Sequence, residues 1–309
     1  MPDALPALVS LADAPLPISR EELAERARQA RHDARGTRAR NTDRTYETGR
    51  QVFEAWCRNR GSPAPFPVPP RLLADFVDDM ARSRKPATVQ TYVAAINAAH
   101  QLLDLPAPGS ATVVRLALKR MRRDFAEAGG EQKQAEPMRM EHIRDALARM
   151  GRTSRTDLRD AALLSLAYDG MFRASELVAL NVRDVQSQGQ DATARLGRSK
   201  TDQEGKGSIR FVARDTVARV RAWVEAEGLE EGAPLFYPLS NVAKGERLTP
   251  RDVGRIFKRR VGEGFSAHST RVGAAVEQRE AGITTGQIAQ AGAGRATPCR
   301  RATRARWTP

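Results

Sequence analysis

Several residue types that mark particular protein classes are scarce in this sequence. Cysteine occurs only twice, at Cys57 and Cys299, and never as a CxxC pair. A disulfide framework and a cysteine-based zinc site are therefore excluded, and the pattern is typical of a protein of the reducing cytoplasm. Aromatic residues make up 5% of the chain, so aliphatic side chains must dominate the packing. No acidic cluster has metal-ligand spacing, and we expect no metal ion or other cofactor.

Long apolar runs are also lacking. Residues 1–19 read MPDALPALVSLADAPLPIS, a stretch with four prolines and no basic segment before its apolar part. From this composition we expect neither a membrane span nor a signal peptide here. The charged residues 20–40 that follow predict a helical, solvated continuation, so we expect a loose arm up to residue 40.

Positive charge is what the sequence has in excess. The chain has 309 residues, and its 51 Lys and Arg against 37 Asp and Glu give a formal charge of +14. A surplus of this size favours a polyanionic partner, most often nucleic acid. A GC-rich genome would explain the choice of Arg over Lys, but not the net excess. Hydrophobic residues make up 40% of the chain, enough for roughly two domains with their own cores.

The spacing of apolar residues predicts a mainly α fold with a small β-hairpin or sheet, which is an α+β chain. In the first half, helices are expected at residues 41–61, 72–80, 88–103 (with Thr88 as its cap) and 110–123. In the second half, two short apolar runs around a Gly-rich turn predict a hairpin within residues 192–213. Helices are expected there at residues 140–150, 158–168 (closed by Gly170), 215–227, 250–261 (capped by Thr249) and 268–281.

Two motifs contain candidate functional side chains before and within the hairpin. In GMFRASELVALNVRDV, Arg173 and Glu176 are three residues apart at a helix start and can share one face. An ordinary i,i+3 salt bridge is the alternative. In GRSKTDQEGKG, Lys200 sits where the hairpin turns, and a long cation there can reach a neighbouring groove. Lys206 competes for this role, and an ordinary solvated turn lysine remains the alternative.

A third motif, FSAHSTRVGAAVE, places His268 and Arg271 three residues apart at another helix start. A helix N-terminus suits a phosphate, whereas a capping or packing role is the alternative for His268. Two arginines, a lysine and a histidine together favour metal-free displacement at a phosphodiester. Arg stabilises the charge on the non-bridging oxygens, Lys can protonate a leaving alkoxide, and His can handle a hydroxyl proton.

The order RASEL, hairpin lysine, HSTR resembles the tyrosine recombinases, also called phage-type integrases, over roughly residues 41–292. The stretch ATVQTYVAAINAAH resembles the helical domain of that family. The resemblance implies that Arg173 and Arg271 clamp the scissile phosphate, that Lys200 is the acid for the 5′-oxygen, and that His268 assists the nucleophile. It implies that Glu176 orients the arginines of the site without contacting the phosphate itself. It also implies duplex DNA as partner, a homo-oligomer on DNA, and strand exchange through a 3′-phosphotyrosyl intermediate.

With this resemblance, we expect five parts in the chain. They are an N-terminal arm, loosely ordered (1–40), a helical DNA core-binding domain (41–125), a linker (126–137), a catalytic domain (138–292) and an aberrant basic tail (293–309).

The tail departs from the family pattern. The family has a Trp or His after QAG and a nucleophilic Tyr nine residues beyond that Trp, but the last tyrosine of this chain is Tyr237 and Trp307 is misplaced. A frameshift explains the departure. In the shifted frame, the third base of each codon is joined to the first two bases of the next codon. The codons of residues 293–294 then permit Trp, and those of residues 302–303 permit Tyr. A divergent natural tail is the alternative.

Three functions follow from these observations. The first is a tyrosine-type recombinase, here impaired by the missing nucleophile. The second is a catalytically dead DNA-binding remnant or regulator that only occupies recombination sites. The third is a basic helical protein unrelated to recombination, which predicts that the four candidate site residues are scattered in the fold.

Overall fold

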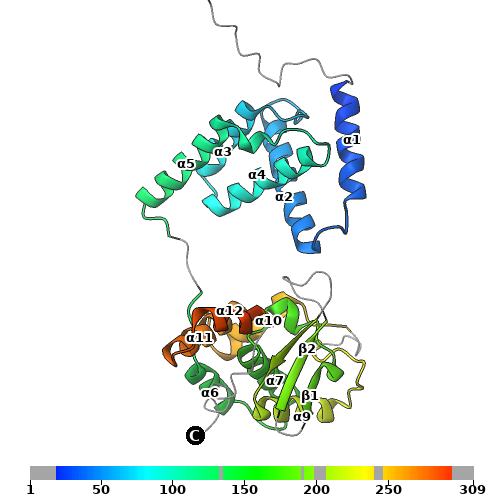
Figure 1. Ribbon diagram of the computed structural model, residues 1–309, viewed down its shortest axis with the longest axis vertical. Coiled ribbons are helices and arrows are strands. Elements are labelled where there is room, and N and C mark those ends of the chain that lie inside the picture. The colour runs from blue at the N-terminus through cyan, green and yellow to red at the C-terminus, as the bar shows by residue number, and fades with distance from the viewer. Residues whose placement is uncertain (1–18, 132–134, 189–190, 198–206, 240–245, 294–309) are drawn as a thin grey trace, which may run out of the picture. The chain divides into compact units, whose positions relative to one another are not determined.

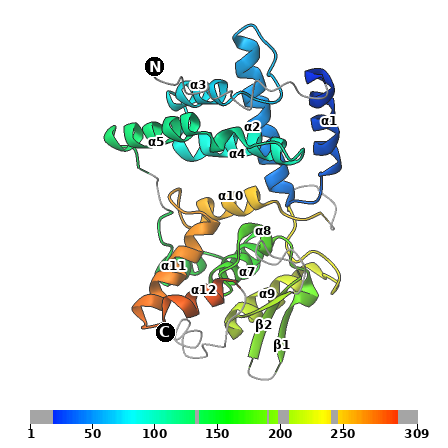
Figure 2. The same cartoon turned by 45° about the horizontal axis from the view of Figure 1, so that its top comes forward.

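A computed structural model of the protein describes residues 19–131, 135–188, 191–197, 207–239 and 246–293 (Figures 1 and 2). The chain divides into two compact units, Met1–Gln132 and Lys133–Pro309. The fold is mainly helical with one small antiparallel sheet, as the apolar spacing predicts.

All the regular secondary structure among the described residues of the N-terminal unit is helical. Its elements are α1 (Arg20–Asp33), α2 (Arg40–Asn59), α3 (Pro70–Ala81), α4 (Pro86–Gln101), the 3₁₀ turn η1 (Pro108–Ser110) and α5 (Thr112–Glu127). Helix α2 packs on α4, and α3 packs on α5. The core joins the rings of Phe53, Trp56 and Phe76 to aliphatic side chains, including Val89 and Val114.

Helix α1 differs from the expected loose arm. Ser19 caps it by accepting the Glu22 backbone N–H at 3.0 Å. Leu23 and Ala27, four residues apart, are 6% and 1% exposed, and α1 contacts α4. The arm is therefore packed helix over residues 20–33. Its narrow apolar stripe is masked in the sequence by the charged residues around it.

Helix α4 also begins earlier than predicted. Its first residue is Pro86 and its N-cap residue is Lys85, so Thr88 lies inside the first turn and does not cap the helix. Proline is accepted at this position because its missing N–H has no partner in the first turn of any helix.

The C-terminal unit surrounds a three-stranded antiparallel sheet with helices. The strands are β1 (Val185–Gln188), β2 (Asp191–Leu196) and β3 (Ser208–Phe211), in the order β1-β2-β3. The predicted hairpin is β2–β3, and β1 extends it. The helices and turns are α6 (Met140–Ala148), α7 (Arg155–Asp169), α8 (Ala174–Leu177), η2 (Val182–Asp184), α9 (Arg214–Glu227), α10 (Pro250–Arg260), α11 (Ala267–Glu280) and α12 (Thr285–Ala293).

Helix α7 is the central element of this unit. Its residues from Ala162 to Asp169 are all buried, which is typical of a helix covered on every side. It packs against α9 and α11. The carboxylate of Asp160 in α7, 0% exposed, accepts hydrogen bonds from Arg259 at 2.9 Å and Arg260 at 2.7 Å. This buried ion cluster ties the end of α10 to the central helix.

Two helix ends match or refine the sequence prediction. Thr249 caps α10, its hydroxyl accepting the Asp252 backbone N–H at 3.2 Å, with Pro250 as first residue. Helices α11 and α12 are separate, because the chain between them turns at Gly282, whose φ of 81° suits glycine.

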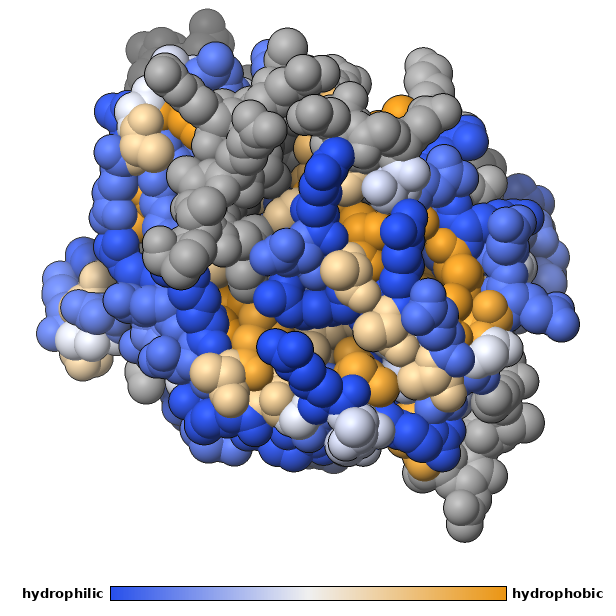
Figure 3. All heavy atoms as spheres, turned by 90° about the horizontal axis from the view of Figure 1, so that it is seen from below, coloured by the Kyte–Doolittle hydropathy of each residue, from blue (hydrophilic) through white to orange (hydrophobic). Residues whose placement is uncertain are grey.

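The surface is mostly polar. Figure 3 shows one face, on which hydrophilic side chains surround separate apolar areas. Among the described residues, the only exposed large hydrophobic side chains are Leu116 and Ile209. None of the helices in this part of the chain is long and apolar enough to cross a bilayer.

Candidate functional site

The turn between α7 and α8 forms the centre of the candidate site. Gly170 closes α7 as its C-cap residue, as predicted, but it is Met171 that takes the left-handed φ, at 48°. A Cβ at Gly170 would lie 2.2 Å from the Phe172 ring, so the ring can pack against the helix end only because this residue is glycine. A left-handed residue other than glycine costs about 1–2 kcal/mol and often marks a functional turn.

Arg173 is the N-cap residue of α8, and Glu176 lies in the first turn of this helix. The Glu176 carboxylate accepts the Arg173 backbone N–H at 2.9 Å and its guanidinium Nη1 at 2.5 Å. The Glu176 side chain is 3% exposed and that of Arg173 28%. The carboxylate therefore holds the guanidinium from the inside of the protein, while the arginine still reaches solvent.

Arg271 reaches the same turn from α11. Its guanidinium donates a hydrogen bond to the carbonyl of Met171, two residues before Arg173. Burial lowers the pKa of Arg271, the nearby charge of Arg173 lowers it further, and Glu176 acts in the opposite sense. Two arginines that are 98 residues apart in the sequence thus lie close enough to repel each other. An anion placed between them would relieve this repulsion.

A third arginine, Arg210 on β3, completes the arrangement and was not among the candidates from the sequence. Its side chain is 2% exposed and donates to Glu176 at 3.2 Å, to the carbonyl of Gly170 at 2.8 Å and to that of Met171 at 3.3 Å. It lies over the ring of Phe172. Burial lowers the pKa of Arg210 to about 10, which leaves it charged at neutral pH.

Alternation along β3 explains why Arg210 escapes sequence analysis. Ile209 is 53% exposed and Arg210 is buried, the reverse of what hydrophobicity alone suggests. The only features of the sequence that indicate a special role for Arg210 are the neighbouring Gly-rich turn and the position of a lone arginine in a short apolar strand.

His268 lies in the first turn of α11, three residues before Arg271. Its side chain is exposed, and the described residues offer its ring no hydrogen-bond partner. The cap of α11 is Ser266, whose hydroxyl accepts the His268 backbone N–H at 3.3 Å. Capping therefore does not occupy the imidazole.

The remaining candidates lie outside the described residues. Lys200 and Lys206 belong to residues 198–206, between β2 and β3, and the tail beyond Ala293 is likewise not described. Within the described part of the chain, no three His, Cys, Asp or Glu side chains come together as a possible metal site.

Comparison with known proteins identifies the family of this chain. The chain belongs to the phage integrase family, whose profile matches residues 115–293. It is 26% identical over 267 residues to the recombinase Cre of Escherichia phage P1, covering 78% of this chain and 76% of Cre. It is 29% identical over 254 residues to an integrase/recombinase XerD homologue of Selenomonas ruminantium, covering 77% and 73%.

Solved structures share the fold. A lambda integrase fragment, crystallised as a dimer bound to a core DNA site, matches with a TM-score of 0.55 and 15% identity, covering 94% of this chain and 95% of that one. At this identity the match shows the fold alone.

Proposed function

We propose that this chain is a tyrosine-type site-specific recombinase that binds duplex DNA but is impaired in cutting it. The observation that carries the proposal is the convergence of Arg173 and Arg271 on one turn, with Glu176 and Arg210 behind them. A basic helical protein unrelated to recombination would have its candidate site residues scattered in the fold, and these two arginines are not scattered.

The arginine pair suits a phosphodiester. A guanidinium offers two parallel N–H donors to phosphate oxygens and stays charged. In strand displacement, negative charge builds on the non-bridging oxygens, and fixed donors stabilise it without reorganisation. Glu176 and the Met171 carbonyl fix the donors from the protein side. His268 is exposed for proton transfer at the attacking hydroxyl, and Lys200 stays a prediction as the acid for the 5′-oxygen.

The missing nucleophile supports impairment. The sequence has four tyrosines. Tyr46 and Tyr92 belong to α2 and α4 of the N-terminal unit. Tyr168 and Tyr237 are 0% and 3% exposed. The Tyr168 hydroxyl donates a hydrogen bond to the half-buried Glu277, and the Tyr237 hydroxyl donates one to the buried Glu227.

Tyr237 is a poor substitute nucleophile for electrostatic reasons. Burial raises its pKa, and the hydrogen bond to Glu227 raises it further, while Arg155 acts in the opposite sense. Its phenol thus resists the deprotonation that attack on a phosphate needs. We infer that residues 293–309 replace the segment that carries the nucleophile in relatives, through a frameshift, and that assembly on DNA is weakened with it.

The lack of a nucleophilic tyrosine also favours a second function. A chain that keeps a phosphate clamp and lacks a nucleophile can occupy recombination sites without cutting them, as a remnant or regulator. In either case residues 41–125 are assigned to DNA core binding and residues 138–292 to the phosphate site.

Lysine substitution tests the clamp. R173K and R271K keep the charge and lose the planar two-point fork, so each should weaken binding to a duplex selected from a random-sequence pool by about 1–3 kcal/mol. R221K, at an exposed position of α9, is the matched control and should bind as the parent does. Unchanged binding by R173K, R271K and the double variant would refute the shared clamp.

A further inference from the structure

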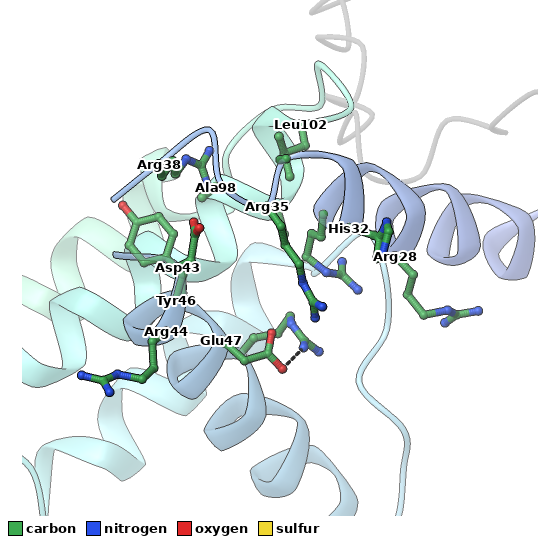
Figure 4. Close-up of a pocket in the computed structure, with 15 residues that line it drawn as sticks. Arg28, His32, Arg35, Arg38, Asp43, Arg44, Tyr46, Glu47, Ala98 and Leu102 are labelled. Carbon is green, nitrogen blue, oxygen red and sulfur yellow. Dashed lines mark hydrogen bonds and ion pairs between the residues drawn. The ribbon is translucent and has the colours of Figure 1, made fainter. Parts of the chain in front are cut away.

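The N-terminal unit contains a hollow that the proposed phosphate clamp does not use. It has a volume of about 620 Å³, within the range of about 300–1,000 Å³ of small-molecule sites. Helix α1, the turn after it, the first half of α2 and the last turns of α4 form its walls (Figure 4).

Positive side chains dominate the lining. They are Arg28, Arg31, Arg35, Arg38, Arg44 and Arg50, with His32 among them. The lining includes two carboxylates, and both are already engaged. Asp43 accepts the Gly36 backbone N–H at 3.3 Å, and Glu47 accepts Arg50 at 2.6 Å and Gln51 at 2.9 Å. Six arginines against two carboxylates give the lining of the hollow a net positive charge.

Three of these arginines form no ion pair among the described residues. Within the part of the chain that the structure describes, the side chains of Arg31, Arg35 and Arg38 make no hydrogen bond or ion pair. Figure 4 shows Arg35 pointing toward Glu47 and Arg44 pointing away from the hollow. Burial lowers the pKa of the half-buried Arg31, and the charge of Arg50 lowers it further, against the opposite effect of Glu54 and Glu47. A bound anion would offset this repulsion.

The rest of the lining is apolar and aromatic. It consists of Ala95, Ala98, Ala99, Leu102 and the ring of Tyr46. Arg38 lies 5.5 Å from the centre of that ring, an arrangement that can take a further flat π system by stacking. A duplex backbone has no flat apolar group to place on this wall, whereas a nucleoside does.

We propose that this hollow binds a nucleoside triphosphate, with its phosphates on Arg31, Arg35 and Arg38 and its base against Tyr46, Ala98 and Leu102. The ligand would be held within the N-terminal unit alone. This site is independent of the phosphate clamp at Arg173 and Arg271, so each proposal can fail without the other.

Calorimetric titration of the full chain with ATP tests the proposal. One ATP should bind per chain, and adenosine and tripolyphosphate should each bind more weakly than ATP. The triple variant R31Q/R35Q/R38Q should bind ATP at least about tenfold more weakly, as expected for lost charge-assisted hydrogen bonds. R115Q, which removes one exposed arginine of α5, should bind ATP as the parent does. Arg35 is exposed, so the fold should accept the substitution R35E. This variant should also bind ATP more weakly than the parent.

Three results would overturn the proposal. The first is no binding of ATP. The second is equal binding of tripolyphosphate and ATP, which would mean that the base makes no contact and that the ligand is an inorganic polyphosphate. The third is displacement of ATP by the selected duplex together with an equal loss of duplex affinity in the triple variant, which would make the hollow part of the DNA-binding surface.

Discussion

At the scale of single residues, Arg210 has the largest predicted effect on stability. It is the only described residue that bonds to Glu176 and also to both carbonyls of the 170–171 turn. R210M would keep most of the volume but leave a buried carboxylate and two carbonyls short of donors. Removing one partner of a buried pair costs about 3–5 kcal/mol, so R210M should lower the free energy of unfolding by that amount, measured by urea denaturation.

Arg195 supplies the control for this prediction. It lies on the neighbouring strand, opposite Ile209 in the register, and its side chain is exposed. R195M should change the unfolding free energy by less than about 0.5 kcal/mol, as is usual for surface positions. Equal effects of the two substitutions would show that Arg210 has no special role.

His100 predicts a dependence of stability on pH. It is 1% exposed, its Nε2 accepts the Val68 backbone N–H at 3.0 Å, and its Nδ1 lies 2.9 Å from the Ile96 carbonyl, so the ring is neutral with its proton on Nδ1. Burial lowers the pKa of His100 below the ordinary 6.5. As the pH falls below about 6.5, His100 takes up a proton in the unfolded chain but not yet in the folded one. The stabilisation is therefore present above about pH 6.5 and is lost as the pH falls toward the folded pKa.

Hydrogen exchange of α4 amides, corrected for the intrinsic pH effect, measures this dependence. Protection should fall between pH 7.5 and 5.5, and less steeply in H100Q. H32Q, which changes an exposed histidine, should follow the parent. If H100Q followed the parent as well, His100 would not be the titrating group.

At the scale of elements, the contact between α11 and the segment before α6 leaves no space for a side chain. The Met138 backbone N–H donates to the Ser269 carbonyl at 3.0 Å, and a Cβ at Gly273 would lie 1.8 Å from the Met138 carbonyl oxygen. G273A must therefore push the segment away from α11, and overpacking of this kind costs about 1–3 kcal/mol.

The matched control for G273A is G254A in α10. A Cβ at Gly254 meets nothing within 4 Å, so alanine should stabilise the protein by up to about 1 kcal/mol through its better helix propensity. Thermal unfolding should shift in opposite directions for the two variants. A stabilising effect of G273A would contradict the close approach.

The same scale shows what could be predicted from sequence. Helix α2 follows from its wide apolar stripe, α10 from its apolar stripe and its Thr249 cap, and the β2–β3 hairpin from its Gly-rich turn. The helical character of α1 is predicted, but its packing is not, because only Leu23 and Ala27 mark its buried face. Arg173, Glu176 and Arg271 could be singled out by motif, whereas Arg210 is buried by tertiary contacts that no local pattern reports.

At the scale of the whole molecule, the charge of +14 predicts how binding responds to salt. Each neutralised phosphate releases counterions, so log K should fall linearly with log salt, with a slope of about −0.9 per contact. The measurement is fluorescence anisotropy of the selected duplex over a tenfold range of salt. Affinity that stayed constant over that range would contradict binding through phosphates.

One measurement tests the central claim most directly. The full chain is incubated with a labelled, nicked half-site made from the selected duplex and is run on a denaturing gel. Because the proposed function combines DNA binding with the lack of a tyrosine in the nucleophile position, we predict binding in a native gel and no covalent band in the denaturing one. The chain with the shifted frame restored should form the band. A covalent adduct of the unmodified chain would contradict the claim and show that another residue is the nucleophile.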